Sequence, residues 1–245
     1  MDKMKYLILG ASSDVGISYI NHLMDSESKA LIIAQYRTMS DKLEELSVCA
    51  REREFNLKLI RADLSRDEDI VSLIAYVKAE IEWPDRIIHL PASKLNYRKL
   101  KDADWLGVAE DFNIQVTSLG KVLSAFLPAM AKNKYGRIAV MLSSVVCDEP
   151  PKYMSEYAIV KNALWGLIKS AASEYSGKNV FVTGISPTMM ETKLLTEVDE
   201  KIIALNAANN KNGRNYTVEE LDVVIDDILS EETDKYNGVN VYPGN

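Results

Sequence analysis

The sequence predicts a single doubly wound α/β domain, in which helices cover both faces of a parallel sheet. Short, continuously apolar segments alternate with longer amphipathic segments along the whole chain, and no linker, internal repeat or change in composition interrupts them. Continuously apolar segments are typical of strands buried on both faces, and regular alternation of strands with helices is typical of a parallel sheet. We therefore expect one domain over residues 1–245.

Seven apolar segments are expected to form the strands. In chain order they are residues 5–9, 30–34, 57–60, 86–90, 137–142, 180–185 and 238–242. Their length and apolar character are those of buried strands. Because parallel strands are joined by right-handed crossovers, their carboxyl ends meet at one edge of the sheet, where ligands bind.

The amphipathic segments are expected to form the helices. Ser65 and Glu68 have the pattern of a capping box, as do Thr217 and Glu220, and apolar residues follow each pair at helical spacing. Another helix is expected after Ser40. Its buried face should hold Leu43, Leu46 and Ala50.

A polar, asparagine-rich segment covers residues 206–216, before the last predicted helix. We expect a loop there. A solvated loop and a lid over the ligand crevice both agree with this composition.

Composition and charge exclude several classes of protein. The 245 residues are 47% hydrophobic and 27% charged, which excludes a disordered or low-complexity chain. Acidic residues outnumber basic ones by 36 to 29, whereas nucleic-acid binding requires an excess of Lys and Arg. The two cysteines and two histidines form neither a disulfide framework nor a metal-binding pattern. With no signal peptide and no membrane-spanning apolar run, we expect a cytoplasmic protein without metal, membrane or nucleic-acid partners.

The first strand is followed by a turn with the sequence context of a dinucleotide-binding loop. Gly10 permits the tight turn, Gly16 permits close approach of helix and strand, and small residues between them leave room for a pyrophosphate at the helix N-terminus. Asp14 stands where glycine is common, and we expect its side chain to cap the helix. The cofactor-binding residues predicted here are Gly10, Ser12, Ser13, Asp14, Val15 and Gly16. An ordinary βα turn is the alternative.

The end of the second strand carries Arg37, followed by Thr38. In nucleotide-binding α/β domains this strand end meets the adenosine ribose, and an acidic residue there favours NAD. A guanidinium instead suits a 2′-phosphate. Arg37 therefore predicts NADP, with a solvated surface arginine as the alternative.

The strongest chemical signal is the pair Tyr157 and Lys161, preceded by Ser143 and Ser144. On a helix, residues four apart share a face, so the ammonium lies near the phenol. A neighbouring positive charge lowers the pKa of a tyrosine, which can then exchange a proton with a carbonyl or alcohol oxygen near neutral pH. A serine hydroxyl at the end of the fifth strand can hold the same oxygen.

In the order and spacing of these motifs the chain resembles the short-chain dehydrogenase/reductase family, in its compact single-domain form. The resemblance covers essentially every motif, and it implies a Rossmann-type fold. It implies a catalytic tetrad of Asn113, Ser144, Tyr157 and Lys161. Asn113 is implied to act through a helix kink and a water. Ser144 lies thirteen residues before Tyr157, the usual family spacing, whereas counting from Gly136 favours Ser143.

The same resemblance assigns further residues to the cofactor. It implies that Asp63 contacts the adenine and that Lys161 holds the nicotinamide ribose. The implied set beyond the first turn is Arg37, Asp63, Leu64, Pro91, Ala92, Tyr157, Lys161, Pro187, Thr188 and Thr192. Arg214 and the pair Asn237-Gly238 match the C-terminal pattern of the family.

Three segments depart from the family pattern. The family's Asn-Asn-Ala-Gly segment is here Leu90-Pro91-Ala92-Ser93, and Pro91 has no backbone N–H to donate. Thr188 replaces a glycine, and the tail over residues 241–245 lacks the family's acidic, double-glycine ending. These changes affect cofactor and subunit contacts rather than catalytic groups.

The prediction is an NADP(H)-dependent oxidoreductase that interconverts a ketone and a secondary alcohol by hydride transfer, with NAD(H) less favoured. The 3-oxoacyl-[acyl-carrier-protein] reductases share its length and motif order, so we expect a small-molecule or carrier-bound ketone. A sugar or polyketide reductase of the same mechanism remains open, as does a sensor that binds the cofactor without catalysis. Lys132, Lys134 and Arg137 form a basic cluster that either faces an acidic carrier or is a solvated helix end.

Family members usually pair through the two long helices that carry the Asn113 and Tyr157 segments. Here these helices hold Val116, Leu119, Leu123, Phe126, Leu164, Trp165 and Ile168. We therefore expect a homodimer or homotetramer, with intramolecular core as the competing interpretation of these residues.

Overall fold

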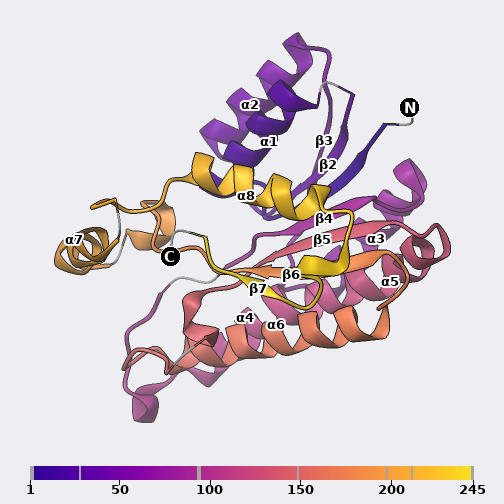
Figure 1. The fold of residues 1–245 in the computed structure, drawn as a ribbon. Helices are drawn as coiled ribbons and strands as arrows, with labels where there is room; N and C mark the ends of the chain where they lie inside the picture. Colours follow the sequence, from indigo (N-terminus) through magenta and orange to yellow (C-terminus); the bar gives the residue numbers. More distant parts are fainter. Residues whose placement is uncertain are drawn as a thin grey trace.

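Seven parallel strands form one sheet in the order β3-β2-β1-β4-β5-β6-β7 (Figure 1). The computed structural model describes residues 3–27, 29–92, 95–147, 149–196, 198–210 and 212–243. The strands are β1 (Lys5–Leu9), β2 (Leu31–Tyr36), β3 (Asn56–Arg61), β4 (Arg86–His89), β5 (Gly136–Met141), β6 (Val180–Ile185) and β7 (Asn240–Val241). The strand order reverses between β1 and β4, which is the switch point where doubly wound sheets bind ligands. The predicted fold class is confirmed.

The predicted strands agree with the observed ones to within about two residues at most ends. β1 and β6 have the predicted bounds, and β2 ends two residues later than expected, at Tyr36. β7 is shorter than the predicted segment because only two of its residues pair with β6, Asn240 with Gly184 and Val241 with Ile185.

Helices cover both faces of the sheet, as Figure 1 shows. One face is covered by α1 (Asp14–Ser26), α2 (Asp41–Glu52) and α8 (Val218–Ser230). The other is covered by α3 (Asp67–Ile81), α5 (Ser118–Lys132) and α6 (Ser155–Glu174), with α4 (Trp105–Phe112) leading into α5. Each layer buries its own apolar cluster against the sheet, which follows from strands that are apolar on both faces.

The two predicted capping boxes have different outcomes. Thr217 and Glu220 form the reciprocal box at the start of α8, as predicted. The box at Ser65 is wrong, because α3 begins only at Asp67 and Ser65 instead donates its hydroxyl to Asp63 Oδ1 at 2.8 Å. The predicted face of α2 is buried.

The predicted loop over residues 206–216 is shorter than expected. Its first four residues belong to α7 (Glu200–Asn209), which stands apart from the sheet in Figure 1. The side-chain oxygen of Asp199 caps α7 by accepting from the N–H of Lys201, 2.8 Å away. In the described part of the chain, the polar connection to α8 therefore covers only residues 210 and 212–217.

α4 and α5 are joined by one turn of π-helix, Asn113–Thr117. The continuous stretch Trp105–Lys132 is long and apolar enough to cross a membrane by length and composition, contrary to our expectation that no segment would qualify. Leu119 and Phe126 from this stretch are fully buried in the domain core, as core helices of this composition are.

This burial also corrects the role expected for the apolar residues that were assigned to a subunit interface. Five of them are at most 2% exposed in the chain's own core: Leu119, Leu123, Phe126, Leu164 and Ile168. Only Val116 and Trp165 of that set are partly exposed. The competing interpretation, intramolecular core, is therefore correct for most of the set.

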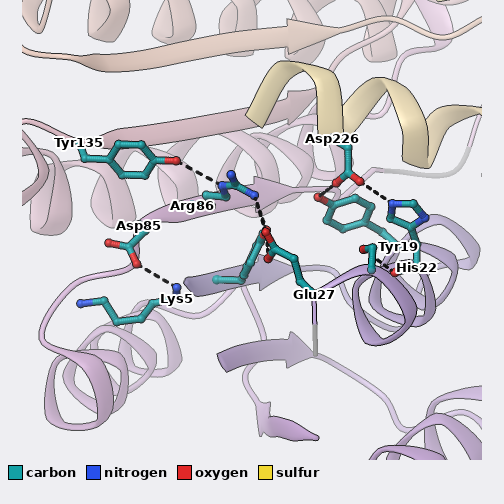
Figure 2. Close-up of polar contacts among 10 residues, drawn as sticks. Lys5, Tyr19, His22, Glu27, Asp85, Arg86, Tyr135 and Asp226 are labelled. Atoms are coloured by element: carbon teal, nitrogen blue, oxygen red, sulfur yellow. Dashed lines mark hydrogen bonds and ion pairs between the residues drawn. The ribbon is translucent and has the colours of Figure 1, made fainter. Parts of the chain in front are cut away.

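A polar network lies at the amino ends of the strands, away from the predicted ligand edge. Figure 2 shows Arg86 of β4 between Glu27 and Tyr135, while Asp226 of α8 contacts both Tyr19 and His22 of α1. These contacts tie α8 to α1.

The predicted basic cluster lies at the same edge. Arg137 is only 3% exposed, donates to the Glu231 carbonyl oxygen at 2.8 Å and lies 4.0 Å from the Phe181 ring centroid. Arg137 is therefore not part of an exposed basic surface, whereas Lys132 and Lys134 are exposed.

Candidate active site

The turn after β1 has the backbone geometry of a phosphate-binding loop. Gly10 adopts φ +80°, and a Cβ there would lie 3.1 Å from the nitrogen of Pro91. A Cβ on Gly16 would lie 2.8 Å from the Cα of Ala11, so Gly16 permits close packing of α1 on the turn, as predicted. Gln35 holds the turn in place by accepting from the Gly10 N–H at 2.9 Å and donating to the Ala62 carbonyl at 2.6 Å.

The predicted cap by Asp14 is wrong. Ser13 caps α1 by accepting from the Gly16 N–H at 3.0 Å, and Asp14 is the first helical residue. Its carboxylate instead accepts from the Lys42 ammonium and from the backbone N–H of Lys193, each at 2.9 Å. Partial burial raises the pKa of Asp14, but these hydrogen bonds outweigh it and hold the pKa below its usual value. The carboxylate therefore fastens the turn to the segment after β6.

A cleft of about 380 Å³ opens beside this turn at the carboxyl ends of the strands. The predicted cofactor residues that line it are Gly10, Ser12, Ser13, Asp14, Val15, Arg37, Asp63, Leu64, Pro91, Ala92 and Thr192. Five predicted residues are not in its lining, namely Gly16, Tyr157, Lys161, Pro187 and Thr188. Thr188 instead approaches Pro243, its N–H lying 3.4 Å from that carbonyl oxygen.

Sequence reasoning missed six residues of the lining, namely Gln35, Leu90, Ile114, Met141, Met190 and Lys193. Three of them, Gln35, Leu90 and Met141, lie at or just beyond the carboxyl ends of strands. Because ligands bind at that edge of a parallel sheet, their positions in the sequence were a sufficient signal. Ser93 in the segment that departs from the family pattern, Asp148 after Cys147, and the tail residues Gly244 and Asn245 lie outside the described residues.

A second hollow adjoins the cleft at the ends of β2 and β3. It is lined by Arg37, Thr38, Arg61, Asp63, Arg66 and Asp69. Arg61 Nε lies 3.4 Å from the carbonyl oxygen of Arg37, so the two guanidinium-bearing residues are neighbours. The hydrogen bonds that Asp63 accepts from Ser65 lower the pKa of the Asp63 carboxyl despite partial burial. Three arginines and two carboxylates, those of Asp63 and Asp69, thus line this hollow.

Tyr157 and Lys161 lie on the first turns of α6, beneath the cleft. The side chain of Lys161 is fully buried, its Nζ donates to the Met141 carbonyl oxygen at 3.0 Å, and Nζ lies 5.7 Å from the Tyr157 ring centroid. Burial lowers the pKa of Lys161 to about 7, against a smaller opposing effect of Asp111. Burial raises the pKa of Tyr157, and a hydrogen bond with Ser143 opposes the increase.

The serine beside Tyr157 is Ser143, not Ser144. Ser143 follows the end of β5 and interacts with the Tyr157 hydroxyl, whereas Ser144 begins the 3-10 helix Ser144–Val146 and is exposed. Counting from Gly136 identifies the serine that contacts Tyr157, because strand pairing fixes positions along β5. Counting back from Tyr157 crosses a loop, whose length varies freely.

Asn113 lies in the π-helix Asn113–Thr117, at the position of the helix kink that the resemblance implies. Asn113 is exposed at the first position of the π-helix, and its Oδ1 accepts from the Thr117 hydroxyl at 3.2 Å. Gln115, two residues later, is fully buried where the π-helix packs against α6. The wider π-helical turn rotates the side chains relative to an α-helix, so the sequence pattern did not reveal that Gln115 faces inward.

The chain belongs to the short-chain dehydrogenase/reductase family of NAD(P)-dependent oxidoreductases. Residues 10–243 match the family model described as enoyl-(acyl carrier protein) reductase. The match covers the cofactor loop, the cleft and the Tyr157 region, so the resemblance found in the motifs is confirmed.

Individual relatives agree with this assignment. Oxidoreductase UcpA of Salmonella typhimurium is 32% identical over 197 residues, 78% of this chain and 71% of that protein. Among solved structures, NAD+-bound xylitol dehydrogenase superposes with a TM-score of 0.87 at 21% identity, covering 100% of this chain and 99% of the other. The 3-oxoacyl (acyl-carrier-protein) reductase of Agrobacterium tumefaciens C58, with NADP bound, has a TM-score of 0.85 at 20% identity, covering 98% and 93%. These structural likenesses concern the fold.

The residues present fit a nicotinamide dinucleotide. The turn at Gly10 has no room for a side chain, the N-terminus of α1 faces the cleft, and the cleft extends from Arg37 to Met190 and Lys193. Backbone N–H groups at a helix N-terminus bind phosphate. Ser12 and Ser13 would hold the pyrophosphate, and Arg37 would hold the adenosine end.

Proposed function

We propose that this protein is an NADP(H)-dependent oxidoreductase that interconverts a ketone and a secondary alcohol. The observation that carries the proposal is the contact of Tyr157 with Ser143, next to buried Lys161, at the edge of the sheet that holds the cleft. The bound nicotinamide would supply or accept the hydride at the carbonyl carbon.

The three side chains divide the remaining chemistry. Tyr157 gives its phenolic proton to the ketone oxygen in reduction and takes it back from the alcohol in oxidation. Ser143 donates a hydrogen bond to the same oxygen and positions it. The ammonium of Lys161 would favour the phenolate, whereas burial raises the pKa of Tyr157 and the hydrogen bond with Ser143 opposes that increase. Because the pKa of Lys161 is lowered to about 7, this help weakens as the pH rises above neutral.

The arginines at the ends of β2 and β3 support NADP over NAD. Arg37, Arg61 and Arg66 surround one hollow, and an arginine fork matches the charge and shape of a 2′-phosphate. The proteins of similar fold include both an NAD+-bound and an NADP-bound enzyme. The support for NADP therefore comes from Arg37, Arg61 and Arg66 of this chain.

The surroundings of Tyr157 support an apolar ketone, such as a 3-oxoacyl chain carried as a thioester. Tyr157 packs in a cluster with Val145, Met154 and Ala158, against which Leu95 and Val146 also lie. Apolar walls favour an acyl chain, whereas a sugar ketone would need polar partners for its hydroxyl groups. A sugar or polyketide reductase of the same mechanism is the second candidate, favoured only by the polar residues Asn240 and Tyr242 near Cys147.

Assembly and location complete the proposal. Trp105 and Leu106 on α4 are 58% and 86% exposed, and Ile159 on α6 is 42% exposed. These apolar residues support a homodimer or homotetramer. The location that we propose is the cytoplasm, and the excess of acidic over basic residues, 36 to 29, opposes a nucleic-acid partner. Light scattering at micromolar concentration tests assembly, and a monomer mass would contradict it.

A turnover screen tests the proposed reaction. The purified protein is mixed with NADPH or NADH and with 3-oxoacyl thioesters, sugar ketones and small aromatic ketones, and the loss of reduced cofactor is followed. We expect NADPH-dependent turnover of at least one ketone, abolished in Tyr157→Phe. NADPH binding without turnover of any ketone would favour a sensor over an enzyme.

A further inference from the structure

The side chain of His89 has no part in the proposed reaction. It lies at the last position of β4 and is fully buried. Within the described part of the chain, neither its Nδ1 nor its Nε2 has a hydrogen-bond partner. A buried polar group without a partner is costly and rare in native proteins, which indicates a water or a functional partner at that place.

The imidazole faces the layer of helices that carries Lys161. His89 pairs with Val140 of β5, and it alternates with Ile88, whose side chain packs in the opposite layer with α1 and α8. Ile87 and Val140 belong to the cluster under α5 and α6. Since side chains alternate along a strand, His89 lies on this second face, where α6 delivers Lys161.

The position of Lys161 follows from the peptide it contacts. The N–H of Leu142 donates to the Ile185 carbonyl at 2.7 Å, so it points toward β6. Because the peptide bond is trans, the Met141 carbonyl oxygen points the opposite way, toward β4. Lys161 Nζ, 3.0 Å from that oxygen, therefore lies over the gap between β4 and β5, one residue beyond the pair of His89 and Val140.

Charge and protonation suit an interaction between the two side chains. Burial and the nearby Lys161 ammonium lower the pKa of His89 to about 3, so the imidazole is neutral near neutral pH and one of its nitrogens is an acceptor. An ammonium has three donors, and the Met141 carbonyl satisfies one. The other groups acting on Lys161 are Tyr157 on α6 and Asp111 on α4.

We propose that neutral His89 is a positioning residue, which accepts a hydrogen bond from the Lys161 ammonium through a buried water and thereby keeps Lys161 charged beside Tyr157. A water bridging two buried polar groups is a common solution where neither can reach the other directly. The effect on catalysis rests on the proposed function of Tyr157. The interaction between His89 and Lys161 does not depend on that function.

The test measures the ionisation of Lys161 and needs no substrate. The lysine side chains are labelled with ¹³C at Cε, the NMR signal of Lys161 is assigned by its absence in Lys161→Met, and its chemical shift is followed as the pH changes. The measurement is made in His89→Gln, which keeps an acceptor at similar length, and in His89→Met, which does not. Circular dichroism and NADPH binding confirm that each variant is folded.

We expect His89→Met to lower the pKa of Lys161 by about one pH unit, because the ammonium then loses its indirect acceptor. His89→Gln should titrate like the unmodified protein. An unchanged titration in His89→Met overturns the proposal, and so does an equal decrease in both variants, which would indicate a packing effect. If either variant does not fold, His89→Asn and His89→Leu provide the same comparison. A protein without ketone turnover still titrates, so failure of the proposed reaction is distinguished from failure of this inference.

Discussion

The carboxylate of Asp14 accepts a hydrogen bond from the backbone N–H of Lys193, 179 positions further along the chain, at 2.9 Å. This contact joins the cofactor turn after β1 to the segment after β6, and both line the cleft. Lys42 of α2 donates to the other oxygen of the same carboxylate. Asp14 thus connects two segments that line the cleft, the turn after β1 and the segment after β6.

Replacing Asp14 tests this connection. We expect Asp14→Gly to release the segment around Lys193, because the backbone N–H loses its acceptor, and to speed its cleavage in limited proteolysis. Asp14→Asn keeps an acceptor oxygen and should be cleaved like the unmodified protein. Equal cleavage of all three proteins would mean that other contacts hold the segment.

The arginine hollow leads to a prediction about cofactor choice. Arg37→Ala should weaken NADPH binding by about 1–3 kcal/mol, the range of a charge-assisted hydrogen bond, and leave NADH binding nearly unchanged. Fluorescence titration of both cofactors measures the difference. Arg53→Ala is the control. Arg53 lies at the end of α2 and pairs with exposed Asp25 of α1, so its loss should affect the binding of neither cofactor. Tighter binding of NADH than NADPH by the unmodified protein would contradict the assignment of NADP.

Two serine substitutions and a tyrosine substitution test the catalytic groups. Tyr157→Phe should lower turnover by roughly 10²–10⁴-fold, the usual contribution of general acid–base catalysis, while NADPH affinity is retained. Ser143→Ala should cause the larger loss of the two serine variants, and exposed Ser144→Ala is its matched control. A larger loss in Ser144→Ala would restore the residue that family spacing favours.

Lys161→Met should slow turnover and move the optimum for alcohol oxidation to higher pH, because Tyr157 loses its neighbouring charge.

Periodicity and turn chemistry were sufficient to predict the sheet, the cofactor turn and the cap at Thr217. Each depends on local residues whose backbone preferences agree with the tertiary structure. Asp14 was misassigned because its partners, Lys42 and Lys193, are distant in the sequence. Ser65 was misassigned because its hydroxyl binds Asp63, two residues earlier, before α3 begins. The catalytic role of Asn113 stays a prediction. Ser143 was distinguishable only by counting along the strand, and His89 carried no signal because burial without a partner is visible only in three dimensions.

The buried carboxyl of Asp222 lies at the contact of α8 with α1 and makes stability depend on pH. It is 3% exposed and accepts from the Ser18 hydroxyl at 2.6 Å, and burial raises its pKa from 3.8 to about 6 in spite of that hydrogen bond and of His22. A raised pKa in the folded state means that the carboxyl stabilises the fold fully below about pH 4 and that this stabilisation is lost as the pH rises through about 6.

Asp222→Asn should therefore unfold like the unmodified protein near pH 4 and be more stable near pH 8, because the amide stays neutral and keeps an acceptor for Ser18. The gain is at most about 3 kcal/mol, the free energy that corresponds to a pKa raised from 3.8 to about 6. Urea unfolding across this range of pH measures it. Asp226→Asn, one turn later on α8, is the control and should lower stability, since Asp226 accepts from Tyr19 at 2.7 Å and contacts His22 (Figure 2). A gain for Asp222→Asn that does not change with pH would show that packing, rather than ionisation, limits the stability of the α1–α8 contact.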